Sequence, residues 1–258
     1  MLFLLTGEVQ IGKTRWLESL VTELADCGVS CVGVLAPGQW VPSEGEHADA
    51  NGFEKLGIDN VLLPSGERIP FARRGDLARA DGTFDEESQA AKAELAWHID
   101  DEAIARVNAH FDELAVRADT TMAASGEPCF GQSAFVPTCR SERSEASAPR
   151  RAACGAGPSP CQPGWTSEGT ESQDPSPTPG LLIVDELGRL EIWRGGGLTS
   201  AMALLAQGPT PAFPHALVVV RDYLLDDAEA LFTEAWPDRC RIAPDEAGRE
   251  VVLAAFEV

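Results

Sequence analysis

The sequence predicts a three-layer α/β sandwich in which helices cover both faces of a mainly parallel central sheet. Short apolar runs of the kind found in buried strands alternate with amphipathic stretches of helical period along most of the 258 residues. An apolar fraction of 44% is large enough to form a core. This alternation continues on both sides of a low-complexity segment at about 120–180, so we expect a single domain over 1–258 that this segment interrupts.

The first elements form a strand–loop–helix–strand unit. Residues 2–5 are a short apolar run, which predicts a buried strand. From Lys13 onward, apolar residues recur at steps of three and four, which predicts a helix, and Gly28 ends it as a C-cap glycine would. Residues 29–36 are apolar and β-branched and predict a second strand. The favoured arrangement of such a unit is a parallel strand pair with a right-handed crossover.

The middle of the chain is less regular. Residues 39–51 are polar and predict a loop. Residues 53–63 and 68–72 predict the two strands of a hairpin around a Pro-Ser-Gly turn. Residues 76–89 are acidic and show no clear period, whereas Asp100 stands where an N-cap would, before apolar residues at helical spacing.

The composition changes abruptly between about 120 and 180. Ser, Pro, Gly, Ala, Thr, Arg and Glu dominate this segment, and the aliphatic periodicity is lost. Such a composition buries too little apolar surface to offset the entropy of ordering, so we expect a disordered insertion. Beyond it, the pattern predicts buried strands at 181–184 and 216–220, helices at 198–207 and 226–236, and weaker elements at 239–242 and 251–256.

The charge balance limits the partners. With 20 Lys and Arg against 41 Asp and Glu, the formal net charge is −21. Surfaces that bind nucleic acid or anionic lipid need clustered Lys and Arg, so we expect neither partner, although one loop can hold the few phosphates of a nucleotide. No apolar run approaches the roughly 20 residues that a bilayer requires. Seven irregularly spaced cysteines favour a reducing compartment, so we expect a cytoplasmic protein, and the sequence identifies no protein partner.

Residues 7–14, Gly-Glu-Val-Gln-Ile-Gly-Lys-Thr, match the Walker A pattern of a phosphate-binding loop. Gly7 permits the sharp exit from the strand, and Gly12 lets the backbone approach the phosphates. Lys13 supplies the charge that bridges β- and γ-phosphate oxygens, and Thr14 offers its hydroxyl to Mg²⁺. Backbone N–H groups at the helix N-terminus converge on the phosphates. The expected nucleotide-binding residues are therefore Gly7, Glu8, Val9, Gln10, Ile11, Gly12, Lys13 and Thr14.

An acidic pair follows the strand expected at 181–184. Asp185 would lie at the C-terminal edge of the sheet, where α/β proteins bind ligands, and would reach Mg²⁺ directly or through water. Glu186 would orient or deprotonate the attacking water. The charge that develops on the γ-phosphate calls for a cation, and Arg221 and Arg73, at the ends of expected elements, are the candidates.

These motifs, in this order, resemble those of the small P-loop nucleoside-triphosphatase family, some of whose members are labelled cancer-related NTPases. The most specific element is the string Asp-Glu-Leu-Gly-x-Leu-Glu at 185–191. Residues 195–197 and 216–221 look like the bacterial branch of the family. The other segments that carry the resemblance are residues 6–14, 52–53, 65–67, 72–73 and 97–100.

The resemblance implies a P-loop α/β core that hydrolyses ATP, GTP and other nucleoside triphosphates with Mg²⁺ and without strong base preference. It implies that Thr14 binds the metal and that Asp185 and Glu186 are the Walker B pair. Three features depart from the family pattern: Gln10 stands where a glycine is usual, Arg15 stands where a second threonine is common, and the long insertion before Asp185 is not a family feature.

We therefore expect Mg-dependent hydrolysis of nucleoside 5′-triphosphates to the diphosphate and phosphate, with Lys13, Glu186 and Arg221 as catalytic residues. Two alternatives stay open. One is a small-molecule or nucleoside kinase in which residues 53–72 form an acceptor pocket. The other is a nucleotide-binding switch or adaptor with little turnover. Phosphate release without an acceptor favours hydrolysis, and turnover that depends on a hydroxyl compound favours transfer.

Overall fold

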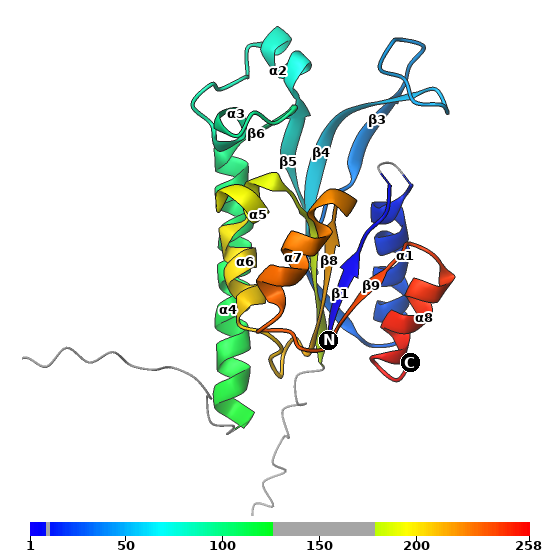
Figure 1. Ribbon diagram of the computed structural model, residues 1–258, viewed down its shortest axis with the longest axis vertical. Helices are drawn as coiled ribbons and strands as arrows, with labels where there is room; N and C mark the ends of the chain where they lie inside the picture. The colour runs from blue at the N-terminus through cyan, green and yellow to red at the C-terminus, as the bar shows by residue number, and fades with distance from the viewer. Residues whose placement is uncertain (9–10, 126–178) are drawn as a thin grey trace, which may run out of the picture. The chain divides into compact units, whose positions relative to one another are not determined.

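A nine-stranded sheet with helices on both faces runs through the described part of the chain (Figure 1). The structure is a computed structural model that describes residues 1–8, 11–125 and 179–258. The strands are β1 (Leu2–Leu5), β2 (Ser30–Leu35), β3 (Gly38–Pro42), β4 (Phe53–Leu63), β5 (Glu67–Arg74), β6 (Trp97–Ile99), β7 (Gly180–Leu187), β8 (His215–Val220) and β9 (Arg239–Ile242).

The helices connect these strands. None of those within the described ranges is both long and apolar enough to cross a membrane. A short 3₁₀ turn, η1 (Asp222–Leu224), follows β8. The α-helices are α1 (Lys13–Asp26), α2 (Gly75–Asp81), α3 (Gln89–Lys92), α4 (Asp101–Ser125), α5 (Arg189–Arg194), α6 (Thr199–Ala206), α7 (Leu225–Phe232) and α8 (Glu246–Ala254).

The sheet is mixed, so the expectation of a mainly parallel sheet is wrong. The strand order is β6-β5-β4-β2-β7-β8-β1-β9, and β3 pairs with β4 outside this row. Among the described strands, β2, β7, β8, β1 and β9 pair in parallel. The pairings β2–β4, β3–β4, β4–β5 and β5–β6 are antiparallel. The predicted hairpin causes this difference, because its strands extend the central sheet through β2 instead of standing apart from it.

The helices form two outer layers, as the sandwich prediction requires (Figure 1). Leu182 and Val184 of β7 face a core built with α4, α6 and α7. Their neighbours Leu181 and Ile183 face a second core built with α1 and α8. This alternation puts apolar side chains on both faces of β7, which is typical of a strand that is covered on both sides.

The predicted insertion is shorter at its start than expected. Helix α4 continues to Ser125, beyond the position near 120 where the insertion was expected to begin. Asp100 caps this helix as predicted, because its Oδ1 accepts from the N–H of Glu102 at 2.9 Å. Strand β7 begins at Gly180. The remainder of the predicted disordered segment, 126–178, lies outside the described residues.

Other predictions were wrong in detail. The expected loop at 39–51 contains most of strand β3, and the unassigned acidic stretch contains most of α2 and the start of α3. Helix α7 ends at Phe232, before Trp236. The Trp236 side chain turns into the core, where its indole N–H donates to the carbonyl of Leu205 at 2.7 Å. That buried hydrogen bond favours leaving the helix before Trp236.

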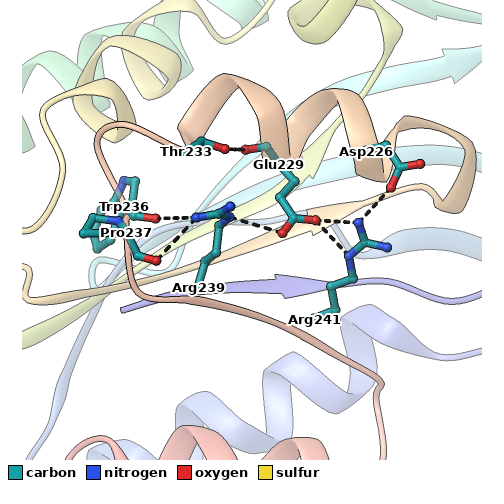
Figure 2. A network of polar contacts seen from close by, with 7 residues as sticks. All are labelled: Asp226, Glu229, Thr233, Trp236, Pro237, Arg239 and Arg241. Carbon is teal, nitrogen blue, oxygen red and sulfur yellow. Dashed lines mark hydrogen bonds and ion pairs between the residues drawn. The ribbon is translucent and has the colours of Figure 1, made fainter.

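An ion-pair network holds the edge strand β9 to helix α7 (Figure 2). The Glu229 carboxylate accepts from the guanidinium groups of both Arg239, at 3.1 Å, and Arg241. Arg241 also reaches Asp226 at 2.7 Å. Hydrogen bonds from Arg241 and Arg239 lower the pKa of Glu229. Charged side chains along an exposed strand edge also discourage pairing with another chain.

Candidate functional site

The Walker A segment forms the turn between β1 and α1. Gly7, at φ 140°, and Gly12, at φ 96°, have backbone conformations that favour glycine, which explains both glycines of the motif. Gly12 is the N-cap of α1, and neither a side-chain cap nor an acidic residue occupies the first turn of this helix. Within the described residues no side chain caps this turn, so its N–H groups can bind an anion. Val9 and Gln10 of the predicted loop lie outside the described residues.

Two side chains form hydrogen bonds with this loop. The Lys13 ammonium donates to the carbonyl oxygens of Gly7 at 2.6 Å and Glu8 at 2.8 Å, so the cation lies within the loop. Asp222, from η1, accepts from the N–H of Gly7 at 2.8 Å and from the hydroxyl of Thr6. These hydrogen bonds, that from Thr6 above all, lower the pKa of Asp222. Asp222 was not predicted, because only folding brings it to the loop.

The Walker A helix and the carboxylate at the end of β7 are in direct contact. The Thr14 hydroxyl donates to Oδ2 of Asp185 at 3.0 Å, and the N–H of Ala36, just after β2, donates to the same oxygen at 3.0 Å. Asp185 is only 3% exposed. Its burial raises the pKa of this carboxyl to about 6. The structure thus brings together the two residues that the sequence predicts as metal ligands.

These two residues fit a magnesium ion in their chemistry. A hydroxyl and a carboxylate supply the hard oxygen ligands that Mg²⁺ prefers, and a buried carboxylate is more stable beside a cation. In the described ranges, no three His, Cys, Asp or Glu side chains gather as a metal cluster. An ion at Thr14 and Asp185 would therefore depend on phosphate oxygens and water for its remaining ligands, as magnesium in nucleotide sites does.

Glu186 and Arg221, which the sequence predicts separately, form an ion pair. Nε of Arg221 lies 2.8 Å from Oε1 of Glu186, and both side chains are about one-third exposed. The pair lies at the C-terminal ends of the neighbouring strands β7 and β8. Arg73, the other arginine candidate, instead forms an ion pair with Asp81 and lines a separate cavity of about 420 Å³. The structure does not bring Arg73 together with the other predicted site residues.

Lys55 of β4 is a site residue that sequence reasoning missed. Its ammonium lies 5.9 Å from the ring centre of Trp40 and 5.5 Å from that of Trp97, within the range of cation–π attraction. Burial lowers the pKa of Lys55, and the nearby carboxylates of Glu186 and Asp185 act in the opposite direction. Lys55 therefore places positive charge before the acidic edge. Only the sheet order brings β3, β4 and β6 together around it, so no local pattern could have identified it.

A cavity of about 190 Å³ opens beside this edge. Glu186 and Arg221 are among the residues that line it. Strands β4, β5 and β6 contribute part of its wall, including Ile58, Phe71 and Trp97, and the segment from the end of β7 into α5 contributes Gly188 to Glu191. Residues 53–72, which would form the acceptor pocket of a kinase, thus contribute side chains to a cavity next to the acidic pair.

Comparison with known proteins adds little to this description. No family model matches the chain, and no curated protein matches it. Among solved structures, the "Solution Structure of a Human Cancer-Related Nucleoside Triphosphatase" is similar over 99% of this chain and 94% of that chain, with 16% sequence identity and a TM-score of 0.46.

Proposed function

We propose that this chain binds a nucleoside triphosphate, ATP or GTP, together with Mg²⁺ and hydrolyses its terminal phosphoanhydride bond. The hydrogen bond between Thr14 and Asp185 carries the proposal, because it joins the phosphate-binding pattern to the acidic strand end that such a loop requires. Neither motif alone would be specific, since glycine turns and acidic strand ends are common.

The phosphate loop binds the triphosphate through three kinds of donor. The N–H groups at the start of α1 have no side-chain cap and accept an anion. The helix dipole adds to this attraction. Lys13 exchanges the carbonyls of Gly7 and Glu8 for β- and γ-phosphate oxygens, which are stronger acceptors because they are charged.

Thr14 and Asp185 would hold Mg²⁺ beside the terminal phosphates. When bound, this ion neutralises phosphate charge and orients the phosphoryl group. Binding also removes the unfavourable burial of an ionised Asp185, because the carboxylate then has a cation next to it.

Glu186 orients the attacking water and accepts its proton. A bond forms between the water oxygen and the γ-phosphorus while the bond to the bridging oxygen breaks, which leaves a nucleoside diphosphate and phosphate. The ion pair with Arg221 fixes the orientation of the Glu186 carboxylate. Lys55 and Arg221 supply the positive charge that the transition state requires near its equatorial oxygens.

A phosphate-release assay on the full chain tests the proposal. ATP, GTP, CTP and UTP are each supplied with Mg²⁺ or with EDTA, and we expect release only with Mg²⁺. Lys13→Ala should lower turnover at least 100-fold and abolish nucleotide binding in calorimetry. Lys92→Ala, which removes an exposed lysine on α3, is the matched control and should behave as the wild type. Normal turnover in Lys13→Ala would overturn the proposal.

Transfer of the phosphoryl group to an organic hydroxyl is the second candidate function. The cavity beside Glu186 favours it, because the carboxylate that would activate water lines a space large enough for a small molecule. No comparable observation favours a binding switch without turnover.

A further inference from the structure

Asn60 of β4 is a buried amide without a hydrogen-bond partner. The residue is only 1% exposed, and neither Oδ1 nor Nδ2 has a hydrogen-bond partner among the described residues. Buried amides in native proteins are nearly always hydrogen-bonded, because leaving both polar atoms unpaired is unfavourable. The matched case is Asn108 of α4, whose amide contacts both the carbonyl of Gly197 and the N–H of Ser200.

Asn60, the residue that carries this unpaired amide, is one of the residues that line the cavity of about 190 Å³, as is Glu186. Ile58, on the same strand, lines this cavity as well. Phe71 and Trp97 add aromatic surface to the wall. A few polar groups set among apolar and aromatic side chains are the usual arrangement for orienting a small ligand.

The position of the cavity relative to the phosphate loop indicates what kind of ligand it takes. Asp185 lines the cavity and also accepts the hydrogen bond from the Thr14 hydroxyl. The cavity therefore adjoins the two residues proposed to bind Mg²⁺. Glu186 and Arg221 line it as well. A molecule in this space would therefore present its nearest group to the terminal phosphate and to the carboxylate proposed as the base.

We propose that this cavity, lined by Ile58, Asn60, Phe71, Trp97, Glu186 and Arg221, is an acceptor pocket for a small monocyclic heterocycle that carries a hydroxymethyl group. The inference rests on the proposed binding of a nucleoside triphosphate. The amide of Asn60 offers one acceptor and one donor side by side, which matches the adjacent N–H and C=O of a lactam ring or the corresponding edge of an aminopyrimidine. A cavity of about 150 Å³ holds benzene, so 190 Å³ suits a single substituted ring.

The reaction is a phosphoryl transfer. The hydroxyl oxygen of the acceptor forms a bond to the γ-phosphorus, and the bond between that phosphorus and the bridging oxygen breaks. The hydroxyl proton passes to the Glu186 carboxylate, which later releases it to solvent. The products are a phosphate monoester and a nucleoside diphosphate, and no oxidant or reductant is required. Water takes the place of the hydroxyl when the pocket is empty.

Binding to the wild-type full chain is the first test. Calorimetry with a non-hydrolysable ATP analogue present measures binding of 5-hydroxymethyluracil and 5-hydroxymethylcytosine. Thymine keeps the ring edge but lacks the hydroxyl, and benzyl alcohol keeps the hydroxyl but lacks the edge. We expect both pyrimidine alcohols and thymine to bind at about 1 mM or tighter, and benzyl alcohol at least tenfold more weakly. With ATP and Mg²⁺, only the alcohols should yield a phosphate monoester.

Asn60→Leu is the second test, because it removes the amide at nearly constant volume. It should weaken binding of 5-hydroxymethyluracil at least tenfold and leave the melting temperature equal or higher. Asn108→Leu, the same change at a partnered amide, should lower the melting temperature. A fall in melting temperature for Asn60→Leu as large as that for Asn108→Leu would mean that the amide supports the fold, and would overturn the inference.

Two failures are distinguishable. If the wild type neither binds nor hydrolyses ATP, the proposed function fails. If it does both but neither pyrimidine alcohol binds or is phosphorylated at 10-fold the concentration expected for binding, the acceptor pocket fails while the hydrolase proposal stands.

Discussion

The hydroxyl of Thr14 donates to the carboxylate of Asp185 at 3.0 Å, across 171 residues of sequence. The contact joins the first turn of α1 to strand β7, on opposite sides of the segment that lies outside the described residues. Whatever that segment does, the two parts of the chain that flank it complete one constellation. Four predictions follow from the charges around it and from the packing that supports it.

The first prediction concerns two aspartates of the site with pKa shifts of opposite sign. Burial raises the pKa of Asp185 to about 6. In the absence of nucleotide, the stability that the protonated Asp185 contributes to the folded state is therefore fully present below the ordinary aspartate pKa of about 4, and it is lost as the pH rises through 6. Asp185→Asn should therefore raise the free energy of unfolding at pH 7 by about 1–3 kcal/mol, and the gain should vanish near pH 4. Turnover should be lost.

Asp222→Asn is the control for this experiment. The hydrogen bonds from Thr6 and Gly7 lower the pKa of Asp222, so its contribution to stability is present above the ordinary aspartate pKa and is lost as the pH falls. This variant should be less stable than the wild type at pH 7, with a smaller difference in acid. Urea titrations at pH 4, 5.5 and 7 measure both variants. A loss of stability at pH 7 in Asp185→Asn would contradict the first prediction.

The second prediction concerns Lys55. Lys55→Met keeps the length of the side chain but removes the charge before the acidic edge, so the turnover number should fall about 10- to 100-fold. Burial lowers the pKa of Lys55, so this side chain loses its charge at a lower pH than an exposed lysine does. Wild-type activity should therefore begin to decline at that lower pH. Lys55→Arg retains its charge there and should remove that decline. Turnover rates measured between pH 6 and 10 test this prediction. If activity declines at the same alkaline pH in Lys55→Arg as in the wild type, the charge of Lys55 does not contribute to turnover.

Glu186→Gln gives the third prediction. The amide keeps the shape of the side chain but accepts a proton poorly, so turnover should fall at least 100-fold while calorimetry still shows nucleotide binding. Glu250→Gln on α8, an exposed position, is the control and should leave turnover unchanged. If the wild type binds nucleotide with negligible phosphate release and Glu186→Gln does not alter it, the chain is a binding switch rather than a hydrolase.

The fourth prediction concerns the network of Figure 2. Glu229→Gln removes the shared partner of Arg239 and Arg241 and should lower the free energy of unfolding by about 1 kcal/mol, since the pairs are partly exposed. High salt should reduce the difference. Glu234→Gln changes an exposed residue two positions after the end of α7 and should have no measurable effect. Equal stability of the two variants in low-salt urea titrations would show that the network contributes nothing.

The sequence was sufficient to predict the elements that carry a local signal. The glycine spacing before Lys13 indicated the loop, the cap at Asp100 indicated where α4 begins, and an apolar run before Asp185 indicated the end of a buried strand. In each case the physical cause lies within a few residues of the feature. Short-range chemistry of this kind can be interpreted without knowing the fold.

Features that depend on long-range pairing were not predictable in this way. Lys55 gains its role from tryptophans on two other strands, and Asn60 is unusual only because it is buried with nothing to bind. The prediction of a mainly parallel sheet was wrong for the same reason. No residue in β4 or β5 shows on its own that the hairpin pairs with β2 in the antiparallel direction. Asp222 reaches Gly7 only after β8 has been placed beside β1.

Strand β2 pairs in parallel with β7 along one edge and antiparallel with β4 along the other. Asp185 and Glu186 lie on β7, and Lys13, Thr14 and Arg221 lie in the segments that follow β1 and β8. Lys55 and Asn60 belong to β4, and Phe71 and Trp97 belong to β5 and β6. Mutations on β5 and β6 can therefore alter which compound is accepted while the residues proposed to cleave the anhydride stay in place. A chain divided in this manner is well suited to diversify by exchanging its antiparallel half, and chimaeras cut at β2 offer a direct way to engineer it.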